Sequence, residues 1–388
     1  MQKVVSCPVC DSAQTEIFLT RENVPVHQNL VMKSAAEART APRGDLNMAV
    51  CKVCGFVYNA TFDLARLDYG AAYDNTQSHS PAFRAHMDSL VTRLIENEGI
   101  SNSRIVEVGC GKGVFLRELI GRTEANNTGV GFDPTYVGPE VDADGRLRFV
   151  RSFYGPDCAE ISADAVVCRH VIEHVPDPLA LLKTVRDALN YSPRARVFFE
   201  TPDVEWILRN QVVWDFFYEH CSLFTAESLT ALFVRAGFEV LSVRREFGDQ
   251  YLWLEAAVTQ QSQAPSFVAS DLAQLAHAFA GVERNLKSKW VERLNTLTAS
   301  GNVALWGAGA KGVTFANLVD PDCTLLNSVI DLNPQKQGRF LPGTGHPIIA
   351  YDAVLDRRII HAIQMNPNYR QENEALLRES GLTLNLVD

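Results

Sequence analysis

Two glycine-rich turns, each placed between an apolar strand-like run and an amphipathic helix-like run, constrain this chain more than any other feature. The first unit reads RIVEV-GCGKG-VFLRELI over residues 104–120. The second reads VALW-GAGAKG-VTFANLV over residues 303–319. A strand, a glycine turn and a helix in succession are typical of a parallel sheet covered by helices. Because the two units lie far apart in the sequence, we expect two separate α/β domains.

The chain length and the spacing of the other elements give the domain organisation. A chain of 388 residues exceeds the ~250–300 at which one hydrophobic core stops growing. Apolar runs predict further strands over 129–132, 163–168 and 195–200, and periodic apolar positions predict helices over 83–98 and 178–189. The polar stretch 259–267 reads as a linker, followed by a long helical segment ending near Leu297. We therefore predict domains over 1–65, 66–258 and 259–388.

Four of the nine cysteines form two C-x-x-C pairs, Cys7 with Cys10 and Cys51 with Cys54. Two such pairs supply four thiolates, which is the ligand set of a structural zinc site. The alternative is four unligated cysteines in a reducing compartment. Since four cysteines leave no open coordination position, a catalytic zinc is disfavoured. We expect residues 1–65 to form a small zinc-binding domain whose folding depends on the metal.

Charge and hydropathy exclude several classes of partner. The formal net charge is −10, and no concentrated basic face is visible, which argues against binding of a nucleic acid polymer. The longest apolar runs fall short of the ~20 residues that a bilayer helix requires, and no signal-type hydrophobic region follows the first residues. We expect a cytoplasmic protein without a membrane partner.

The first turn carries the marks of a ligand site. Gly109, Gly111 and Gly113 follow the strand in a G-x-G-x-G spacing, which lets the backbone turn tightly and approach a ligand at a helix N-terminus. Such glycines alone are a weak signal and also occur where they only close a turn. Two acids favour a ligand: Glu107 within the strand, and Asp133 at the end of the next strand, where a carboxylate can accept ribose hydroxyls.

The string E-V-G-x-G-x-G, followed by G-x-D, resembles class I S-adenosylmethionine-dependent methyltransferases more than dinucleotide dehydrogenases. The string HVIEHVPDP (170–178) resembles the segment after the fourth strand of such enzymes. The resemblance implies a class I methyltransferase Rossmann-like domain that binds S-adenosylmethionine. Gly109 and Gly111 would face the methionine end and Asp133 the ribose. The other implied cofactor-binding residues are Glu107, Gly113, His170 and Val171.

Further strings resemble the sugar C-methyltransferases of deoxysugar biosynthesis, a pathway class that includes antibiotic biosynthesis. They are DYGAAYDNTQSHS (68–80), YEHCSLFT (218–225), WGAGAKGVTF (306–315) and SVIDLNPQKQGRFLPGTGHPI (328–348). The resemblance covers essentially the whole chain. It implies an N-terminal zinc domain, a central methyltransferase domain and a second Rossmann-like α/β domain, and a small-molecule substrate that is a nucleotide-linked keto sugar.

Methylation of a carbon next to a ketone requires a base, stabilisation of the enolate, and a methyl donor in line with the carbanion. The resemblance assigns the base to His220 with Glu219 assisting, because a neighbouring carboxylate raises the basicity of an imidazole. It assigns enolate or proton-relay roles to His174 and Tyr73. The alternative for each of these residues is packing without a catalytic role.

Two departures from the family bear on the acceptor. The tyrosine expected two residues before Glu219 is replaced by Phe217, and Tyr218 takes the substrate-contact assignment instead. The family string H-G-G-S is replaced by FGDQYLW at 247–253. Another ketone-bearing metabolite, or an O- or N-methyl acceptor on another natural-product scaffold, therefore stays open.

The second turn completes a G-x-G-x-x-G pattern with Gly307, Gly309 and Gly312, and Asp331 ends the next strand. A dinucleotide-binding oxidoreductase or sensor is one reading of this pattern. The other reading uses the cations, which the sequence predicts to converge on the diphosphate of a nucleotide sugar: Lys311, Lys336 and Arg339. A turn that only packs, with solvated cations, is the third.

Overall fold

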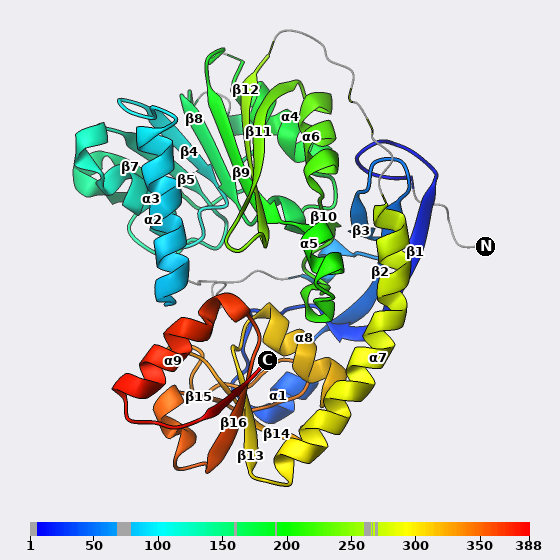
Figure 1. The fold of residues 1–388 in the computed structure, drawn as a ribbon. Coiled ribbons are helices and arrows are strands. Elements are labelled where there is room, and N and C mark those ends of the chain that lie inside the picture. The colour runs from blue at the N-terminus through cyan, green and yellow to red at the C-terminus, as the bar shows by residue number, and fades with distance from the viewer. Residues whose placement is uncertain are drawn as a thin grey trace.

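The computed structural model describes residues 6–67, 79–158, 161–190, 192–259, 265, 267 and 271–388. Tyr73 and most of the expected linker lie outside these described residues. The chain forms three sheets, of four, eight and five strands, which confirms the predicted α/β class (Figure 1). Among the described residues, no helix has both the length and the apolar character that crossing a membrane requires.

The central eight-stranded sheet has the order β11-β12-β9-β8-β4-β5-β7-β6. Its strands are β4 (Arg104–Val108), β5 (Thr128–Phe132), β6 (Val141–Asp142), β7 (Leu147–Val150), β8 (Ala165–Arg169), β9 (Arg196–Pro202), β11 (Phe238–Glu246) and β12 (Tyr251–Val258). Strands β7, β5, β4, β8 and β9 are parallel, whereas β12 is antiparallel to both of its neighbours, β9 and β11. The strand order reverses between β4 and β8, so their carboxyl ends form the crevice where such sheets bind ligands.

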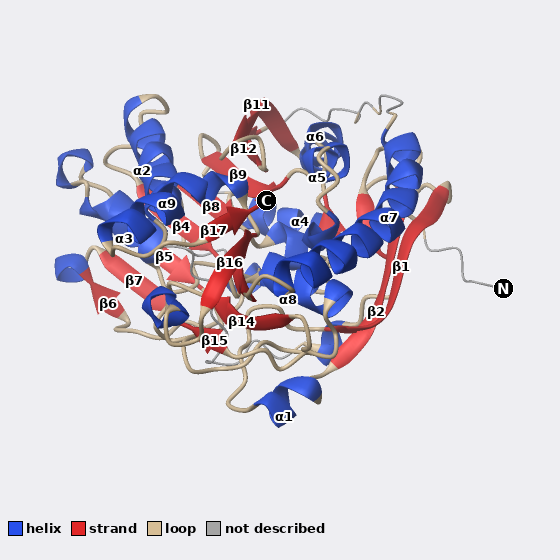
Figure 2. Cartoon of the chain, turned by 60° about the horizontal axis from the view of Figure 1, so that its bottom comes forward, coloured by secondary structure: helices blue, strands red, loops and turns tan. Residues whose placement is uncertain are grey.

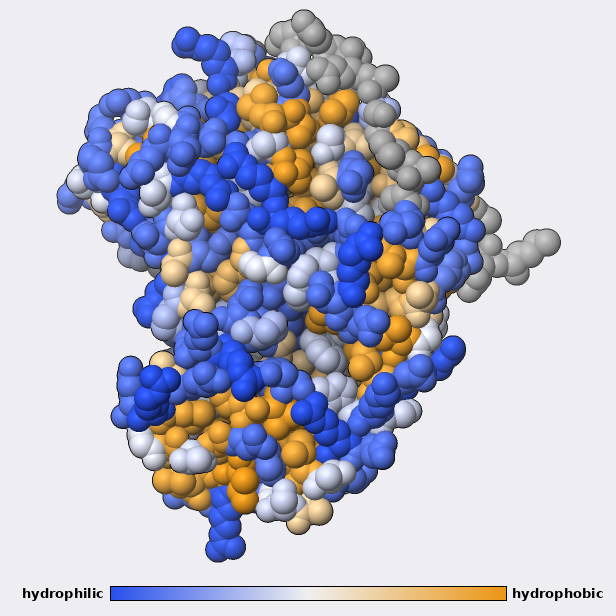
Figure 3. Space-filling view, viewed as in Figure 1, coloured by the Kyte–Doolittle hydropathy of each residue, from blue (hydrophilic) through white to orange (hydrophobic). Residues whose placement is uncertain are grey.

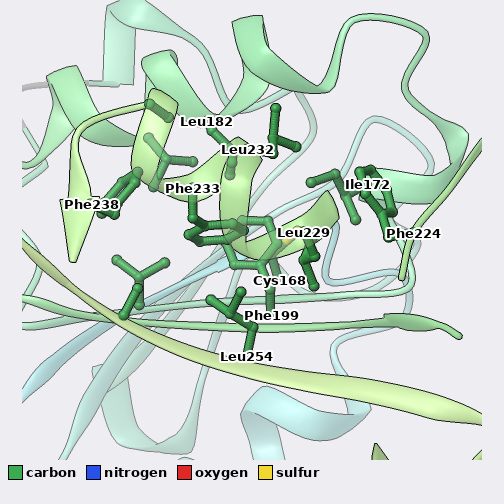
Figure 4. Close-up of a cluster of buried hydrophobic side chains, with 14 of the residues drawn as sticks. Cys168, Ile172, Leu182, Phe199, Phe224, Leu229, Leu232, Phe233, Phe238 and Leu254 are labelled. Carbon is green, nitrogen blue, oxygen red and sulfur yellow. The ribbon is translucent and has the colours of Figure 1, made fainter. Parts of the chain in front are cut away.

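Helices α2 (Pro81–Glu96), α3 (Val114–Gly121), α4 (Pro178–Ala188) and α6 (Ala226–Arg235) cover both faces of this sheet, whereas α5 (Val204–Arg209) joins the core of the N-terminal sheet. Ser80 caps α2, and a reciprocal Thr225–Ser228 capping box begins α6. Figure 4 shows the core between α4, α6 and the sheet, where Leu182 and Phe233 pack on Phe199 and Leu254. The sequence-based strands and helices lie within a few residues of these bounds, but β6, β7, β11, α5 and α6 were not expected.

The N-terminal sheet has the order β1-β2-β3-β10, with β1 (Thr15–Pro25), β2 (Arg43–Cys51), β3 (Val57–Asn59) and β10 (Ser222–Leu223). The short helix α1 (Ala35–Arg39) lies between β1 and β2. Three rings join this sheet to later segments: Phe18 on β1 contacts Phe216 at 5.7 Å and Phe279 at 6.5 Å between ring centroids. The expected self-contained domain over 1–65 therefore shares its core and its edge strand with the rest of the chain.

The C-terminal sheet is parallel, with the order β15-β14-β13-β16-β17. Its strands are β13 (Asn302–Trp306), β14 (Leu326–Ile330), β15 (Ile348–Ile349), β16 (Ile359–Gln364) and β17 (Asn385–Val387). Its helices are α7 (Leu272–Thr298), α8 (Ala310–Val319) and α9 (Arg370–Glu379). Figure 2 shows α7 running from this domain along β1 and β2. The second glycine turn thus opens a second Rossmann-like unit, as predicted.

Short 3-10 helices connect these elements: η1 (Leu64–Arg66), η2 (Thr123–Ala125), η3 (Ala143–Gly145), η4 (Pro156–Cys158), η5 (Ile172–His174), η6 (Val213–Asp215), η7 (Tyr351–Val354) and η8 (Pro367–Tyr369). Figure 3 shows that the surface is indented between the central domain and the C-terminal domain. The elements that meet beneath this surface, η5, η6 and α8, form the site described below.

Candidate active site

A cavity of about 270 Å³ lies between the central and C-terminal domains. One wall comes from residues after β8 and after η6 in the central domain: His170, Glu173, His174, Phe217 and His220. The opposite wall comes from the second glycine turn and the loop after β14: Gly307, Gly309, Lys311, Asp331 and Lys336. The cavity therefore joins histidines of one domain to cations of another.

The structure brings His174 and His220 together, as the sequence predicted, with ring centroids 4.9 Å apart at an interplanar angle of 86°. His220 ends a turn in which its N–H donates to the carbonyl of Phe217 at 3.2 Å. Burial lowers the pKa of His220 well below its usual value, and the positive charges of His174, His170 and Lys311 act in the same direction. His220 is thus a neutral imidazole at neutral pH, which is the form that a general base requires.

The same turn directs the two intervening side chains away from the cavity, which corrects two predictions. Glu219 is fully buried, but its Oε2 accepts a hydrogen bond from the Gln28 N–H at 2.8 Å, and its Oε1 lies 3.8 Å from Nδ1 of His27. Tyr218 accepts a hydrogen bond from the Asp63 N–H at 2.9 Å. Both side chains therefore face the N-terminal region.

Phe217 takes the cavity position in place of Tyr218, with its ring centroid 4.0 Å from that of His220. Gln250, in the string that replaces H-G-G-S, also lines the cavity, and its side chain exchanges hydrogen bonds with Asn366 at 3.0 and 3.2 Å. Both departures from the family pattern therefore lie at the cavity.

The buried carboxylate beside the histidines is Glu173, which the sequence analysis missed. One carboxylate oxygen of Glu173 and one ring nitrogen each from His174 and His220 lie within 4.8 Å of one another. Its Oε1 is 3.4 Å from Nδ1 of His170. The signal was present in HVIEH, where a glutamate stands three residues after one histidine and directly before another.

His170, which the sequence predicted only as a cofactor-binding residue, is part of a buried ionic network. Its Nε2 lies 3.3 Å from Glu200, which also binds Arg169 at 2.8 Å and His86 at 2.6 Å. Burial opposes protonation of His170, but Glu200 and Glu173 prevail and raise its pKa to about 9. Burial likewise opposes ionisation of Glu200, yet Arg169 and His170 hold its pKa well below the usual range. The network places an imidazolium at the cavity wall.

The first glycine turn has space for a ligand. Gly111 has φ +52, and a Cβ added there would meet no atom within 4 Å. In contrast, Cβ atoms at Gly109 and Gly113 would contact Val171 at 2.2 Å and Phe149 at 2.4 Å, respectively. These two glycines therefore permit packing, while Gly111 leaves the approach to the turn open.

Two acids flank that open approach. Asp133 accepts hydrogen bonds from the Gly111 N–H at 2.9 Å and the Thr135 N–H at 2.7 Å, and stays partly exposed. Glu107 is buried, its Oε2 has no hydrogen-bond partner within the described ranges of the chain, and burial raises its pKa to about 8. An exposed glycine turn between a ribose-type acceptor and an unsatisfied carboxyl group fits the adenosyl and amino-acid parts of S-adenosylmethionine.

The second glycine turn supplies two of the three predicted cations. Lys311 Nζ lies 2.8 Å from Asp215 and 3.2 Å from Oε1 of Gln250. Lys336 is 5% exposed, and its Nζ donates to the Ala308 carbonyl at 3.0 Å. Arg339 is exposed and does not line the cavity, so the predicted three-cation cluster is reduced to two at this site.

The four predicted zinc ligands converge. Cys7 Sγ is 3.6 Å from Cys54 Sγ, and Cys10 Sγ is 3.5 Å from Cys51 Sγ. Zn–S bonds of ~2.3 Å in a tetrahedron require S···S distances of about 3.8 Å, so the arrangement fits a structural zinc ion. The cluster joins the loop before β1 to the end of β2, far from the cavity lining.

Comparisons with known proteins agree with this geometry. Residues 81–243 match the family model of a methyltransferase domain, and residues 256–379 match that of the C-methyltransferase C-terminal domain. The chain is an S-adenosylmethionine-dependent methyltransferase. The oxidoreductase alternative is thereby excluded as the main activity of this methyltransferase.

Individual relatives cover different parts of the methyltransferase. The C-methyltransferase NovU of Streptomyces niveus is 26% identical over 296 residues, covering 71% of this chain and 69% of that protein. A ubiquinone biosynthesis O-methyltransferase of Vibrio campbellii is 32% identical over 114 residues, covering 28% of this chain and 47% of its own length. This chain therefore matches about half of the O-methyltransferase. The solved riboflavin-derivative dimethyltransferase RosA of Streptomyces davawensis is 22% identical over 45% of this chain and 54% of that chain. The two structures superpose with a TM-score of 0.36.

Proposed function

We propose that this methyltransferase transfers a methyl group to a carbon adjacent to a ketone in a nucleotide-linked deoxysugar, through base-catalysed enolate formation. The observation that carries the proposal is one cavity that holds a neutral, partly buried His220 on one wall and the buried cation Lys336 on the other. A base suits the ketone-bearing part of such a substrate, and cations suit its diphosphate.

His220 removes the α proton in this proposal. Its imidazole is neutral, lines the cavity and lies against His174, so the lone pair of one ring nitrogen is available to the acceptor. His174, with Tyr73 from the undescribed segment, relays protons or holds the enolate oxygen. Bound S-adenosylmethionine supplies an electrophilic methyl group. Glu107, Gly111 and Asp133 would hold that cofactor, with Gly109, Gly113, His170 and Val171 shaping the surrounding backbone and wall.

Lys311 and Lys336 bind the diphosphate in this proposal. Lys336 is a buried ammonium that donates a hydrogen bond to the neutral Ala308 carbonyl, and such a charge is stabilised by an anion. Lys311 is paired with Asp215. Burial raises the pKa of Asp215, and the positive charge of Lys311 opposes that rise. An arriving phosphate would compete with this carboxylate for the ammonium.

A second acceptor class is favoured by Phe217 and Gln250, which stand at the cavity where the family has other residues. A phenyl ring beside His220 cannot donate the hydrogen bond that a tyrosine hydroxyl would offer. A ketone-bearing natural product without a sugar is therefore the second candidate.

The test is incubation with S-adenosylmethionine and a panel of dTDP-, UDP- and GDP-linked keto sugars, followed by mass spectrometry and NMR of the product. We expect one added methyl group on carbon and, when the methyl donor is omitted, exchange of the proton next to the ketone for solvent deuterium. His220→Ala should lose turnover and deuterium incorporation while binding S-adenosylhomocysteine normally. Methyl transfer to oxygen or nitrogen, or turnover by the variant, would refute the mechanism.

We also propose that the four cysteines hold one structural zinc ion. Metal analysis of the purified protein should find one zinc per chain, and Cys51→Ser should lose it and destabilise the shared N-terminal core. A chain that is fully stable and metal-free would contradict this assignment.

A further inference from the structure

We propose that Glu173, and not Glu219, is the carboxylate that positions and compensates the cavity histidines during proton removal. This inference rests on the proposed base function of His220. It concerns a positioning residue, since Glu173 acts on the acceptor only through the imidazoles around it.

Glu173 is a carboxylate hydrogen-bonded at one oxygen, whose other oxygen is ion-paired with Nδ1 of His170 at 3.4 Å. The residue lies in η5, has no exposed surface, and its Oε2 accepts a hydrogen bond from the Thr201 hydroxyl at 3.2 Å. Its Oε1 has no hydrogen-bond partner among the described residues. An oxygen without a hydrogen-bond donor on a fully buried carboxylate is costly unless a donor or a positive charge satisfies it.

Proton removal creates a new positive charge beside this carboxylate. When His220 takes the α proton, its partly buried ring becomes an imidazolium, which desolvation and the surrounding positive charges disfavour. A carboxylate oxygen within 4.8 Å of the ring nitrogen offsets part of this cost. Glu173 occupies that position from inside the cavity wall.

Glu219 cannot serve in the same way, although it is adjacent to His220 in the sequence. Its Oε2 is engaged by the Gln28 N–H, and its Oε1 faces His27. Its carboxylate therefore ties the turn to the N-terminal region.

The other charges around the site leave Glu173 as the carboxylate that can respond. On β9, Glu200 is bound by Arg169, His86 and His170 together. On β12, Tyr251 presents its ring to His170, with centroids 4.6 Å apart. On α8, Lys311 adds positive charge that works against protonation of His220. Glu173 is close to His170 and also to the His174–His220 pair, so its charge acts on all three imidazoles.

The matched variants are Glu173→Gln and Glu219→Gln, each of which keeps the shape of the side chain and removes its charge. Histidine ring signals are titrated by NMR in the full chain without acceptor, with His170→Gln and His220→Gln assigning the peaks. We expect Glu173→Gln to move the titration of His170 to lower pH, and Glu219→Gln to leave it in place. This readout needs no turnover, so it decides the inference even if the proposed acceptor is wrong.

With an acceptor from the panel, Glu173→Gln should lower kcat at least tenfold with little change in KM, and Glu219→Gln should lower it less. Glu173→Asp, which keeps the charge, should restore the titration of His170 and part of kcat, whether or not the glutamine variant folds well. A titration shift and the larger loss of kcat in Glu219→Gln, with neither in Glu173→Gln, would overturn the inference. Equal titration in all three proteins would overturn it as well.

Discussion

The two glycine turns are built alike and are used differently. In each, the first glycine donates its N–H to the residue that ends the next strand, Gly109 to Phe132 and Gly307 to Ile330, both at 2.8 Å. In each, the acid that follows that strand accepts a backbone N–H from the turn, Asp133 at 2.9 Å and Asp331 at 2.7 Å. The shared hydrogen bonds show that this pattern is first of all a way to close a turn.

The differences lie in the strand and in the neighbours. The first strand carries the buried acid Glu107, where the second carries the apolar Leu305. Openness does not separate the two turns, because a Cβ at Gly111 or at Gly307 would meet no atom within 4 Å, and a Cβ at Gly113 or at Gly312 would overlap its neighbours. The second turn lines the cavity and is tied to the central domain by Lys311 and Asp215. A formally complete G-x-G-x-x-G therefore does not establish a dinucleotide site.

The largest effect should come from filling the packed glycine. Gly312→Ala should lower the free energy of unfolding by about 3 kcal/mol, because the added Cβ overlaps backbone that cannot move aside. Gly111→Ala should cost only ~1 kcal/mol of backbone strain, and should weaken S-adenosylhomocysteine binding. Urea unfolding and calorimetry measure the two quantities. If Gly111→Ala binds S-adenosylhomocysteine with normal affinity, the first turn does not bind the cofactor.

A smaller effect should distinguish the two acids. Asp133→Asn should weaken S-adenosylhomocysteine binding by about 2 kcal/mol, or roughly 30-fold, since a charged acceptor of ribose hydroxyls is lost. Asp331→Asn is the matched control and should leave that affinity unchanged. Calorimetry with S-adenosylhomocysteine and with NAD checks both. Equal losses of S-adenosylhomocysteine affinity in the two variants, or tight binding of NAD, would contradict the assignment of the cofactor to the first turn alone.

A further prediction concerns the cations. Lys311→Met should raise the acceptor KM about tenfold through the loss of one charge-assisted contact, without changing cofactor affinity. Arg339→Met is the control, because Arg339 is exposed and outside the cavity lining. Steady-state kinetics with a panel substrate measures the difference. A larger effect from Arg339→Met would return that residue to the binding site.

The smallest effect should appear in the pH profile. Activity requires neutral His220, so it is lost as pH falls through a pKa that burial places well below 6.5. Lys311→Met removes one of the positive charges that lower this pKa, so the acid limb of kcat/KM should move upward by a few tenths of a pH unit. Rate measurements at constant ionic strength test the sign. Movement toward lower pH would contradict the assignment of His220 as the titrating base.

Much of the fold was readable because its signals are local. Strand β4 and helices α3 and α4 lie where the apolar pattern placed them, since periodicity and turn residues act over a few positions. Strands β6, β7 and β11 and helices α5 and α6 were not predicted; β7, for example, has four residues, LRFV, which are too few for a clear two-residue periodicity. The sharing of β10 and α7 with the N-terminal sheet was also missed, because such pairing depends on residues far apart in the sequence.

The sequence by itself determined the α/β class, the two glycine turns and the cysteine quartet, because each is carried by residue type and short spacing, and it predicted roles for His174 and His220 through a family resemblance. The tertiary structure decided which side chains meet. In the turn over residues 217–220, Glu219 and Tyr218 face the N-terminal region, and Phe217 and His220 face the cavity. The fold also brings Glu173, from η5, beside the histidines. Side-chain direction in a turn depends on the packing around it, and adjacency in the sequence does not encode it.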